Sequence, residues 1–199
     1  MTMRMFAAVL PPDQSSDELN RAVEGLRAGS TDLRWTERDG WHFTLAFMGE
    51  VEEALLPELT ELLEQAAHRT ETFPLRIQGA GQFAGTALWA GAAGGVDELR
   101  IFAERVNATV RRAGVKLDQH HPYQAHLTLA RVTGRARMDL SPYVKALEDF
   151  AGTEWEVTDL ALVRSNPPVN GVPSRQPRYE VIARAPLGGP RHVHAVSDR

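Results

Sequence analysis

The chain has no cysteine among its 199 residues. Disulfide bonds, thiolate metal sites and a cysteine nucleophile are therefore excluded. The N-terminal segment also lacks an apolar run long enough to span a bilayer or to form the core of a secretory signal. A protein without disulfides fits any compartment, and we expect this one to be cytoplasmic, with no membrane partner.

Lysine is almost absent as well. Only Lys116 and Lys145 contribute to the 22 basic residues, so arginine supplies the rest. The formal net charge of −4 excludes a protein whose whole surface attracts nucleic acid. Guanidinium groups match phosphate oxygens in shape, but a GC-rich genome also enriches arginine, and we favour that explanation for most of these residues.

The remaining composition is typical of a globular protein. Hydrophobic residues make up 43% of the chain and charged residues 24%. A chain of this length can form one large domain or two small lobes. We expect one bilobal domain over residues 1–187, followed by a polar C-terminal tail over residues 188–199.

Helical and strand-like patterns alternate along the chain, and several neighbouring strands are close enough to form hairpins. This arrangement predicts an α+β fold with largely antiparallel sheets rather than a doubly wound parallel sheet. A capping-box pattern at Ser15 and Glu18 predicts the start of the first helix, and Ser141 followed by Pro142 predicts the start of the last. Helices are expected over 15–29, 53–68, 96–113 and 141–150, and strands over 3–10, 33–35, 73–80, 86–92, 154–164 and 178–186.

The pattern His-x-Thr occurs twice, each time within an apolar run that reads as a strand. The first copy is His42 and Thr44 within WHFTLAF, and the second is His126 and Thr128 within AHLTLAR. Residues two apart in a strand share a face, so each histidine points the same way as its threonine. A polar face on an apolar strand is costly unless it lines a cleft or finds partners.

The apolar residues between these polar positions are expected on the opposite face, which includes Phe43, Leu45 and Phe47 in the first copy. A single His-x-Thr is most simply a structural histidine beside a good strand former. Two copies in matching contexts are harder to explain in this way. We therefore expect two half-sites that face each other across one cleft.

Two imidazoles across a cleft can act on one substrate as general acid and general base, because the ordinary pKa of histidine lies near neutrality. The threonine hydroxyls can donate hydrogen bonds to a group held between them. Arg131 adds a cation, although it lies on the opposite face unless strand regularity is broken near Ala130. Such a site fits a phosphodiester, on which negative charge grows in the transition state.

Other kinds of catalysis find less support in the sequence. His120 and His121 precede the second motif, but no Asp or Glu lies at ligand spacing from either motif, so we expect no metal. His192 and His194 in the tail are expected to be inert. No nucleophile elbow and no phosphate-binding glycine loop are present.

These motifs resemble those of the 2H phosphoesterase superfamily, and within it the bacterial RNA 2′,3′-cyclic phosphodiesterases, also called 2′-5′ RNA ligase or LigT-like proteins. The resemblance covers roughly residues 3–187. Besides the doubled motif, it rests on the opening strand 3–11, on residues 34–36, on a central hairpin that includes 81–83 and 88–91, and on the closing strands with 162–165 and 179–181.

The resemblance implies two pseudo-symmetric antiparallel sheets with helices on the outside, a central cleft and no metal or other cofactor. It implies that His42 is the proton donor and His126 the proton acceptor, and that Thr44 and Thr128 hold phosphate oxygens. The implied activity is hydrolysis of RNA 2′,3′-cyclic phosphate ends to 2′-phosphomonoesters. The implied partners are such RNA ends or cyclic nucleotides, and we expect a monomer.

Two alternatives to hydrolysis remain open. The reverse reaction would join a cyclic-phosphate end to a 5′-hydroxyl and make a 2′-5′ linkage. A nucleotide-binding module without turnover is the other alternative, although both histidines and both threonines are retained. Trp41, Phe83 and Tyr123 are candidates for stacking on a terminal base, and a place in the core or the cleft wall is the simpler role for each.

Overall fold

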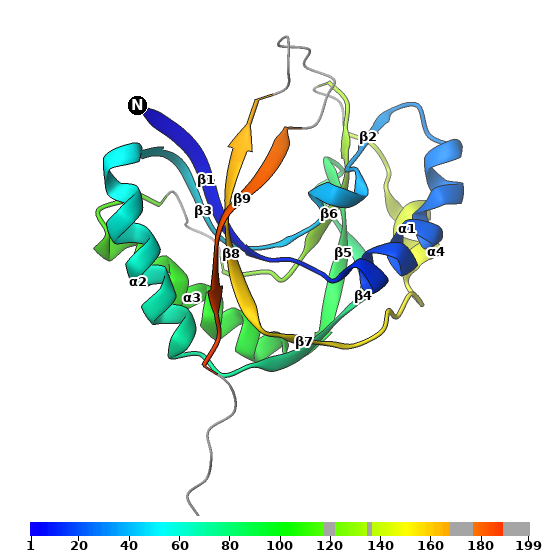
Figure 1. The fold of residues 1–199 in the computed structure, drawn as a ribbon. Helices are drawn as coiled ribbons and strands as arrows, with labels where there is room; N and C mark the ends of the chain where they lie inside the picture. The colour runs from blue at the N-terminus through cyan, green and yellow to red at the C-terminus, as the bar shows by residue number, and fades with distance from the viewer. Residues whose placement is uncertain (118–121, 135–136, 168–176, 189–199) are drawn as a thin grey trace, which may run out of the picture.

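Two antiparallel sheets face each other in the computed structural model, which describes residues 1–117, 122–134, 137–167 and 177–188. The first sheet has the strand order β3-β1-β8-β9, and the second has the order β2-β6-β5-β4-β7 (Figure 1). Helices cover the outer faces of both sheets, which leaves the inner faces to form a cleft. The expected fold class is confirmed.

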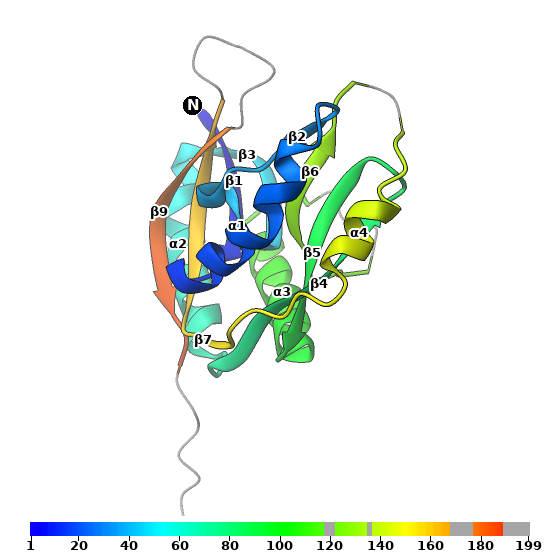
Figure 2. The ribbon, with the colours of Figure 1, turned by 90° about the vertical axis from the view of Figure 1, so that its right-hand side faces the viewer.

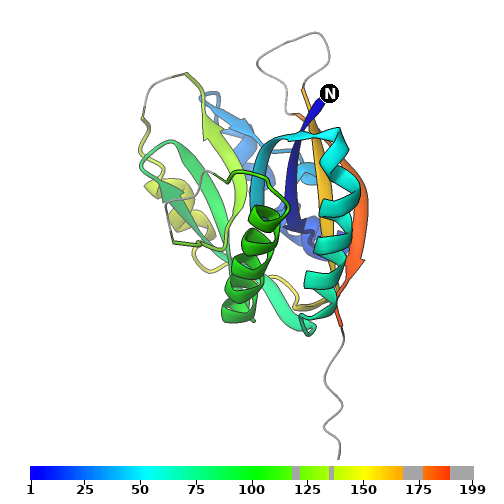
Figure 3. The same cartoon turned by 90° about the vertical axis from the view of Figure 1, so that its left-hand side faces the viewer.

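The first sheet is built around β1 (Thr2–Val9), which pairs with β3 (Phe43–Glu52) on one side and β8 (Asp159–Asn166) on the other. The edge strand β9 (Arg178–Pro186) pairs with β8. Figure 3 shows α2 and α3 against the outer face of this sheet. These helices are α2 (Leu56–His68), which follows the short 3-10 helix η2 (Glu53–Leu55), and α3 (Val96–Arg112).

The second sheet is covered by α1 and α4, as Figure 2 shows. Its strands are β2 (Leu33–Trp35), β6 (Leu127–Val132), β5 (Ala87–Gly94), β4 (Phe73–Phe83) and β7 (Trp155–Val157). Its helices are α1 (Asp13–Ala28) and α4 (Ser141–Leu147), and the 3-10 helix η1 (Arg38–Gly40) precedes β3.

The buried stripe of α3 agrees with the pattern in the sequence. Leu99, Phe102, Val106 and Val110 are completely buried, and they occupy successive turns of one helix face. The helix ends before Gly114, which has the positive φ of 84° that a residue without a side chain adopts at low cost. Burial of this stripe holds α3 against β3 and so supports the first half-site from behind.

The capping box expected at Ser15 is wrong. Helix α1 begins at Asp13, directly after Pro12, whose backbone is extended. Ser15 is buried and its hydroxyl donates to the Thr153 carbonyl oxygen, while Glu18 accepts a hydrogen bond of 2.7 Å from the Thr153 N–H. The two side chains thus bind a distant loop instead of capping their own helix.

The single strand expected over residues 154–164 is also wrong, because this segment forms two strands in different sheets. β7 pairs with β4 of the second sheet, and β8 pairs with β1 of the first. Thr158 lies between them, and its carbonyl oxygen accepts a hydrogen bond from the Leu187 N–H. An apolar run has the same periodicity whether or not the chain changes sheet.

The end of the expected domain is well anchored. Leu187 is buried, and the Gly188 N–H donates to the Thr70 carbonyl oxygen. The rest of the expected tail, residues 189–199, lies outside the described residues, so the domain boundary stays a prediction. Within the described part of the chain, no helix is both long and apolar enough to cross a membrane.

Candidate active site

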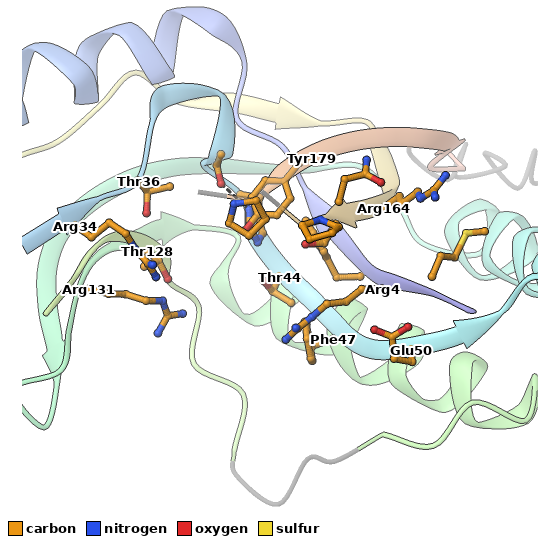
Figure 4. Close-up of a pocket in the computed structure, with 18 of the residues that line it drawn as sticks. Arg4, Arg34, Thr36, Thr44, Phe47, Glu50, Thr128, Arg131, Arg164 and Tyr179 are labelled. Atoms are coloured by element: carbon orange, nitrogen blue, oxygen red, sulfur yellow. Dashed lines mark hydrogen bonds between the residues drawn. The ribbon is translucent and has the colours of Figure 1, made fainter. Parts of the chain in front are cut away.

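A cavity of about 680 Å³ brings the two His-x-Thr motifs together. His42 and Thr44 line it from the first sheet, and His126 and Thr128 line it from the second. The expectation that both motifs meet in one cleft is therefore confirmed in its geometry, although the role of each residue stays a prediction. Figure 4 shows the two threonines from the two sheets and the arginines around them.

Both histidines are held in the same way. His42 Nδ1 lies 2.8 Å from the Gly40 carbonyl oxygen, and His126 Nδ1 lies 2.7 Å from the Gln124 carbonyl oxygen. A carbonyl oxygen only accepts, so each Nδ1 carries its proton and donates it. Each Nε2 is therefore the ring nitrogen that accepts a proton when the imidazole is neutral and donates one when it is charged.

The imidazole ring of His42 packs against two aromatic side chains. Its ring stacks on Phe6 of β1 at 4.5 Å between centroids, and Tyr179 of β9 packs edge-on against it at 5.4 Å. The pKa of His42 is lowered to about 4, mainly by burial and in addition by the nearby His126, against the opposing effect of the Gly40 carbonyl. The ligand-free protein therefore holds a neutral imidazole here at pH 7.

His126 is the more accessible of the pair. Phe83 packs edge-on against its ring at 4.9 Å, and Trp89 lies 6.3 Å away. Burial also lowers the pKa of His126, the positive charge of Arg131 acts in the same direction, and the Gln124 carbonyl opposes both. The two imidazoles thus have similar tethers but different electrostatic surroundings.

A bulge in β3 changes which side chains face the cleft. Ala8 pairs with Thr44, but Ala7 pairs with Ala46, so Leu45 is the additional residue. Thr44 and Phe47 therefore share the cleft face, although they are three residues apart. The expectation that Phe47 faces the core is wrong: its side chain lines the cavity and is 44% exposed.

A matching bulge occurs in β6. Trp89 pairs with Thr128, but Leu88 pairs with Ala130, so Leu129 is the additional residue. The sequence predicts that Arg131 reaches the cleft only if the strand is irregular near Ala130, and this bulge is such an irregularity. Arg131 consequently lines the same cavity as Thr128, while a role in binding substrate stays a prediction.

Asn107 of α3 secures the bulge in β3 from the core side. Its buried side-chain amide donates to the Leu45 carbonyl oxygen at 2.7 Å and to the Ala103 carbonyl oxygen at 2.6 Å. Leu45 is the additional residue of the bulge, so Asn107 binds the backbone immediately after Thr44. A buried carbonyl without such a donor would cost about 1–3 kcal/mol.

Other arginines at the cavity were not singled out as site residues from the sequence. Arg4, Arg34 and Arg164 line it together with Arg131. Arg4 alternates with apolar residues in β1, and this alternation is the signal that could have placed it on the cleft face. Burial raises the pKa of the Tyr179 phenol, and the charges of Arg131, Arg4 and Arg34 oppose this effect, so these three guanidiniums lie near that ring.

The remaining candidate residues have different positions. Trp41 is 3% exposed and belongs to the core, and Tyr123 packs against the core, so both have the simpler role. Phe83 is 39% exposed beside His126. Within the described residues, no group of three or more His, Asp or Glu side chains could hold a metal ion. His120, His121, His192 and His194 lie outside the described residues.

Comparison with known proteins agrees with this architecture. The pattern of the 2′-5′ RNA ligase superfamily matches residues 11–167. An RNA 2′,3′-cyclic phosphodiesterase of Thermus thermophilus is 30% identical over 203 residues, covering 94% of this chain and 91% of that protein. One of Aquifex aeolicus is 25% identical over 183 residues, covering 88% of this chain and 94% of that protein.

Solved structures show the same fold. The protein TT0787 of Thermus thermophilus has a TM-score of 0.76 and 28% identity, covering 95% of this chain and all of that chain. LigT of E. coli, complexed with 3′-AMP, has a TM-score of 0.70 and 22% identity, covering 94% and 99%. Because the matched pattern spans most of the sequence and both motifs, the chain belongs to the 2′-5′ RNA ligase superfamily.

Proposed function

We propose that the protein hydrolyses RNA 2′,3′-cyclic phosphate ends to 2′-phosphomonoesters, without a metal or other cofactor. The observation that carries this proposal is the pair of half-sites, in which two Nδ1-tethered histidines line one cavity together with two threonines. The name shared by the curated relatives, RNA 2′,3′-cyclic phosphodiesterase, supports the same substrate.

The reaction requires one neutral imidazole, which accepts a proton, and one protonated imidazole, which donates one. Neutral His126 takes a proton from water, the water oxygen forms a bond to phosphorus, and the bond from phosphorus to the 3′-oxygen breaks. Protonated His42 gives its proton to the departing 3′-oxygen, which leaves a phosphate on the 2′-oxygen. The choice of His42 as acid follows from the family resemblance.

The electrostatics of the cleft suit these roles once substrate is bound. Burial makes a protonated His42 a strong acid, because it favours the neutral imidazole. The negative charge of the bound phosphodiester favours protonation and so supplies the charged form. Thr44 and Thr128 donate to the phosphate oxygens, and Arg131 stabilises the charge that grows on them.

The two alternatives differ from hydrolysis in their products. Ligation uses the same acid and base in the same roles: His126 takes a proton from the 5′-hydroxyl of a second RNA in place of water, and His42 gives its proton to the departing 3′-oxygen. A binding module would retain a cyclic nucleotide unchanged. The high concentration of water favours hydrolysis unless closure of the cleft excludes it. We further propose that the protein acts as a monomer in the cytoplasm.

A turnover assay tests this proposal. Purified protein is incubated with adenosine 2′,3′-cyclic phosphate in the presence of EDTA, and the products are separated by chromatography. We expect AMP to accumulate over many turnovers, and the His42→Ala/His126→Ala double variant to form none above background. Bound but unchanged nucleotide would support the binding module instead, and loss of activity with EDTA that a divalent ion restores would overturn metal independence.

The same assay with an added 5′-hydroxyl oligoribonucleotide separates hydrolysis from ligation. We expect the cyclic ends to be converted mainly to monoesters. A 2′-5′-linked product in excess of the monoester would make ligation the main reaction.

A further inference from the structure

The cavity has more positive charge than one cyclic phosphate requires. Of the described residues that line it, four are arginines and one, Glu50, is acidic. A cyclic phosphodiester has a single negative charge, and Thr44, Thr128 and Arg131 already provide donors for it. A second anionic group on the substrate would use the charge of Arg4.

Arg4 is the arginine whose position suggests such a group. It belongs to β1 and lies on the side of the cavity formed by the first sheet, beside Thr44 and opposite the group of Arg34, Thr128 and Arg131 (Figure 4). Its guanidinium lies over the Phe47 ring, 5.2 Å from the centroid. No ion pair joins Arg4 to any residue that the structure describes, so its charge is available to a ligand.

A second bulge in β3, in which Met48 is the additional residue, brings Phe47 next to Arg4. Phe47 pairs with Phe6, and Glu50 pairs with Arg4, so Phe47 lies on the cleft face next to the arginine. A large aromatic ring that is 44% exposed gains little by packing, but its face attracts a cation and fixes the direction of the Arg4 side chain. This contact favours a position of the guanidinium at the cavity.

Arg4 lies near the histidine pair on the same strand as Phe6. Arg4 and Phe6 are neighbours on the cleft face of β1, about 7 Å apart along the strand. Phe6 in turn stacks on His42. A phosphate bound at Arg4 would therefore be separate from a phosphate between the two histidines and would lie on the same wall of the cavity as His42.

We propose that Arg4, supported by Phe47, forms a second phosphate subsite that binds the internucleotide phosphate on the 5′ side of the terminal nucleotide. This inference rests on the proposed function and sharpens it: the favoured substrate is an oligoribonucleotide end, and a cyclic mononucleotide lacks the group that Arg4 binds. The subsite contributes binding free energy and takes no part in proton transfer.

Three substrates test the subsite: a 2′,3′-cyclic mononucleotide, the dinucleotide with the same cyclic end, and that dinucleotide with an uncharged methylphosphonate linkage. We expect the wild-type protein to show a kcat/KM at least about fivefold higher for the charged dinucleotide than for the other two. Loss of one phosphate contact should also lower the slope of log(kcat/KM) against log[salt] by about 0.7.

The Arg4→Gln variant should lose this preference, mainly through KM, while Arg111→Gln on the exposed end of α3 controls for net charge and should behave as wild type. The Phe47→Leu variant should lose part of the preference, because the guanidinium is no longer held. Equal kcat/KM for the charged and methylphosphonate dinucleotides in the wild-type protein would overturn the subsite, as would an unchanged preference in Arg4→Gln. Absence of turnover on all three substrates would instead overturn the proposed function.

Discussion

The two half-sites of the cleft share their backbone geometry and differ in what surrounds the imidazole. In both, Nδ1 donates to a carbonyl two residues earlier, and a bulge follows the threonine. His42 packs between Phe6 and Tyr179, whereas His126 contacts Phe83 and lies near Arg131. The repeated geometry places both His-x-Thr motifs at one cavity, and the different surroundings affect the pKa of each imidazole differently.

This comparison implies that neither histidine can replace the other. We expect His42→Ala and His126→Ala each to lower kcat by at least about 10²-fold, because one supplies the proton and the other removes one. The double variant should be little worse than the poorer single variant, since an acid without a base is ineffective. Single-turnover kinetics on a cyclic nucleotide measure the rate of the chemical step in each variant. A near wild-type rate in either single variant would contradict the assignment of the two histidines as acid and base.

The pH dependence measures the electrostatic difference directly. The pKa of each histidine in the ligand-free protein lies below the ordinary value of 6.5, at about 4 for His42. Activity needs one protonated and one neutral imidazole, and above pH 6.5 both are neutral. We therefore expect kcat/KM to peak below pH 6.5 and to fall as the pH rises, with two macroscopic pKa values that belong to the coupled pair.

The profile of kcat should lie at higher pH than that of kcat/KM, because bound phosphodiester favours the charged imidazole. A kcat/KM profile that stays flat from pH 6 to pH 8 would contradict the pKa directions on which this comparison rests.

Arg131 and Phe47 occupy equivalent positions, each three residues after the threonine of its motif and just past the bulge. The second half-site therefore has a cation where the first has an aromatic ring. We expect Arg131→Ala to raise KM about tenfold, since one charged contact to the phosphate is lost. The wild-type KM should rise with salt, and that of the variant should rise less. Arg111→Ala is the matched control. Unchanged kinetics in Arg131→Ala would show that Arg131 does not bind the substrate.

The smallest effect is expected at Asn107, which supports only the first half-site. Asn107→Leu should lower the free energy of unfolding by about 1–3 kcal/mol, because the Leu45 carbonyl loses its buried donor. The kcat/KM should fall severalfold as Thr44 shifts. Val110→Ala, on the same helix, lowers stability without removing a hydrogen bond to β3 and serves as the control. If both variants lose stability but neither loses activity, Asn107 is structural only.

Residue patterns in the sequence predicted the meeting of the motifs but not every side chain around them. Period-two alternation predicts which face of the sheet a side chain occupies only while the strand is regular. It therefore placed Phe47 on the wrong face, and it could place Arg131 in the cleft only if the strand was irregular near Ala130. A bulge depends on partners such as Asn107, which lies 62 residues from Leu45. The same non-local dependence explains why Ser15 and Glu18 bind the Thr153 loop, and why 154–164 divides between two sheets.

The unequal half-sites lead to one chemical outcome that can be observed directly. Phosphorus NMR of the wild-type reaction with a 2′,3′-cyclic nucleotide distinguishes the 2′-phosphate from the 3′-phosphate. With His42 as the acid beside the 3′-oxygen, we expect the 2′-phosphomonoester as the dominant product. A dominant 3′-phosphate would contradict the account, because the ribose would then lie reversed in the cleft with His126 as the acid.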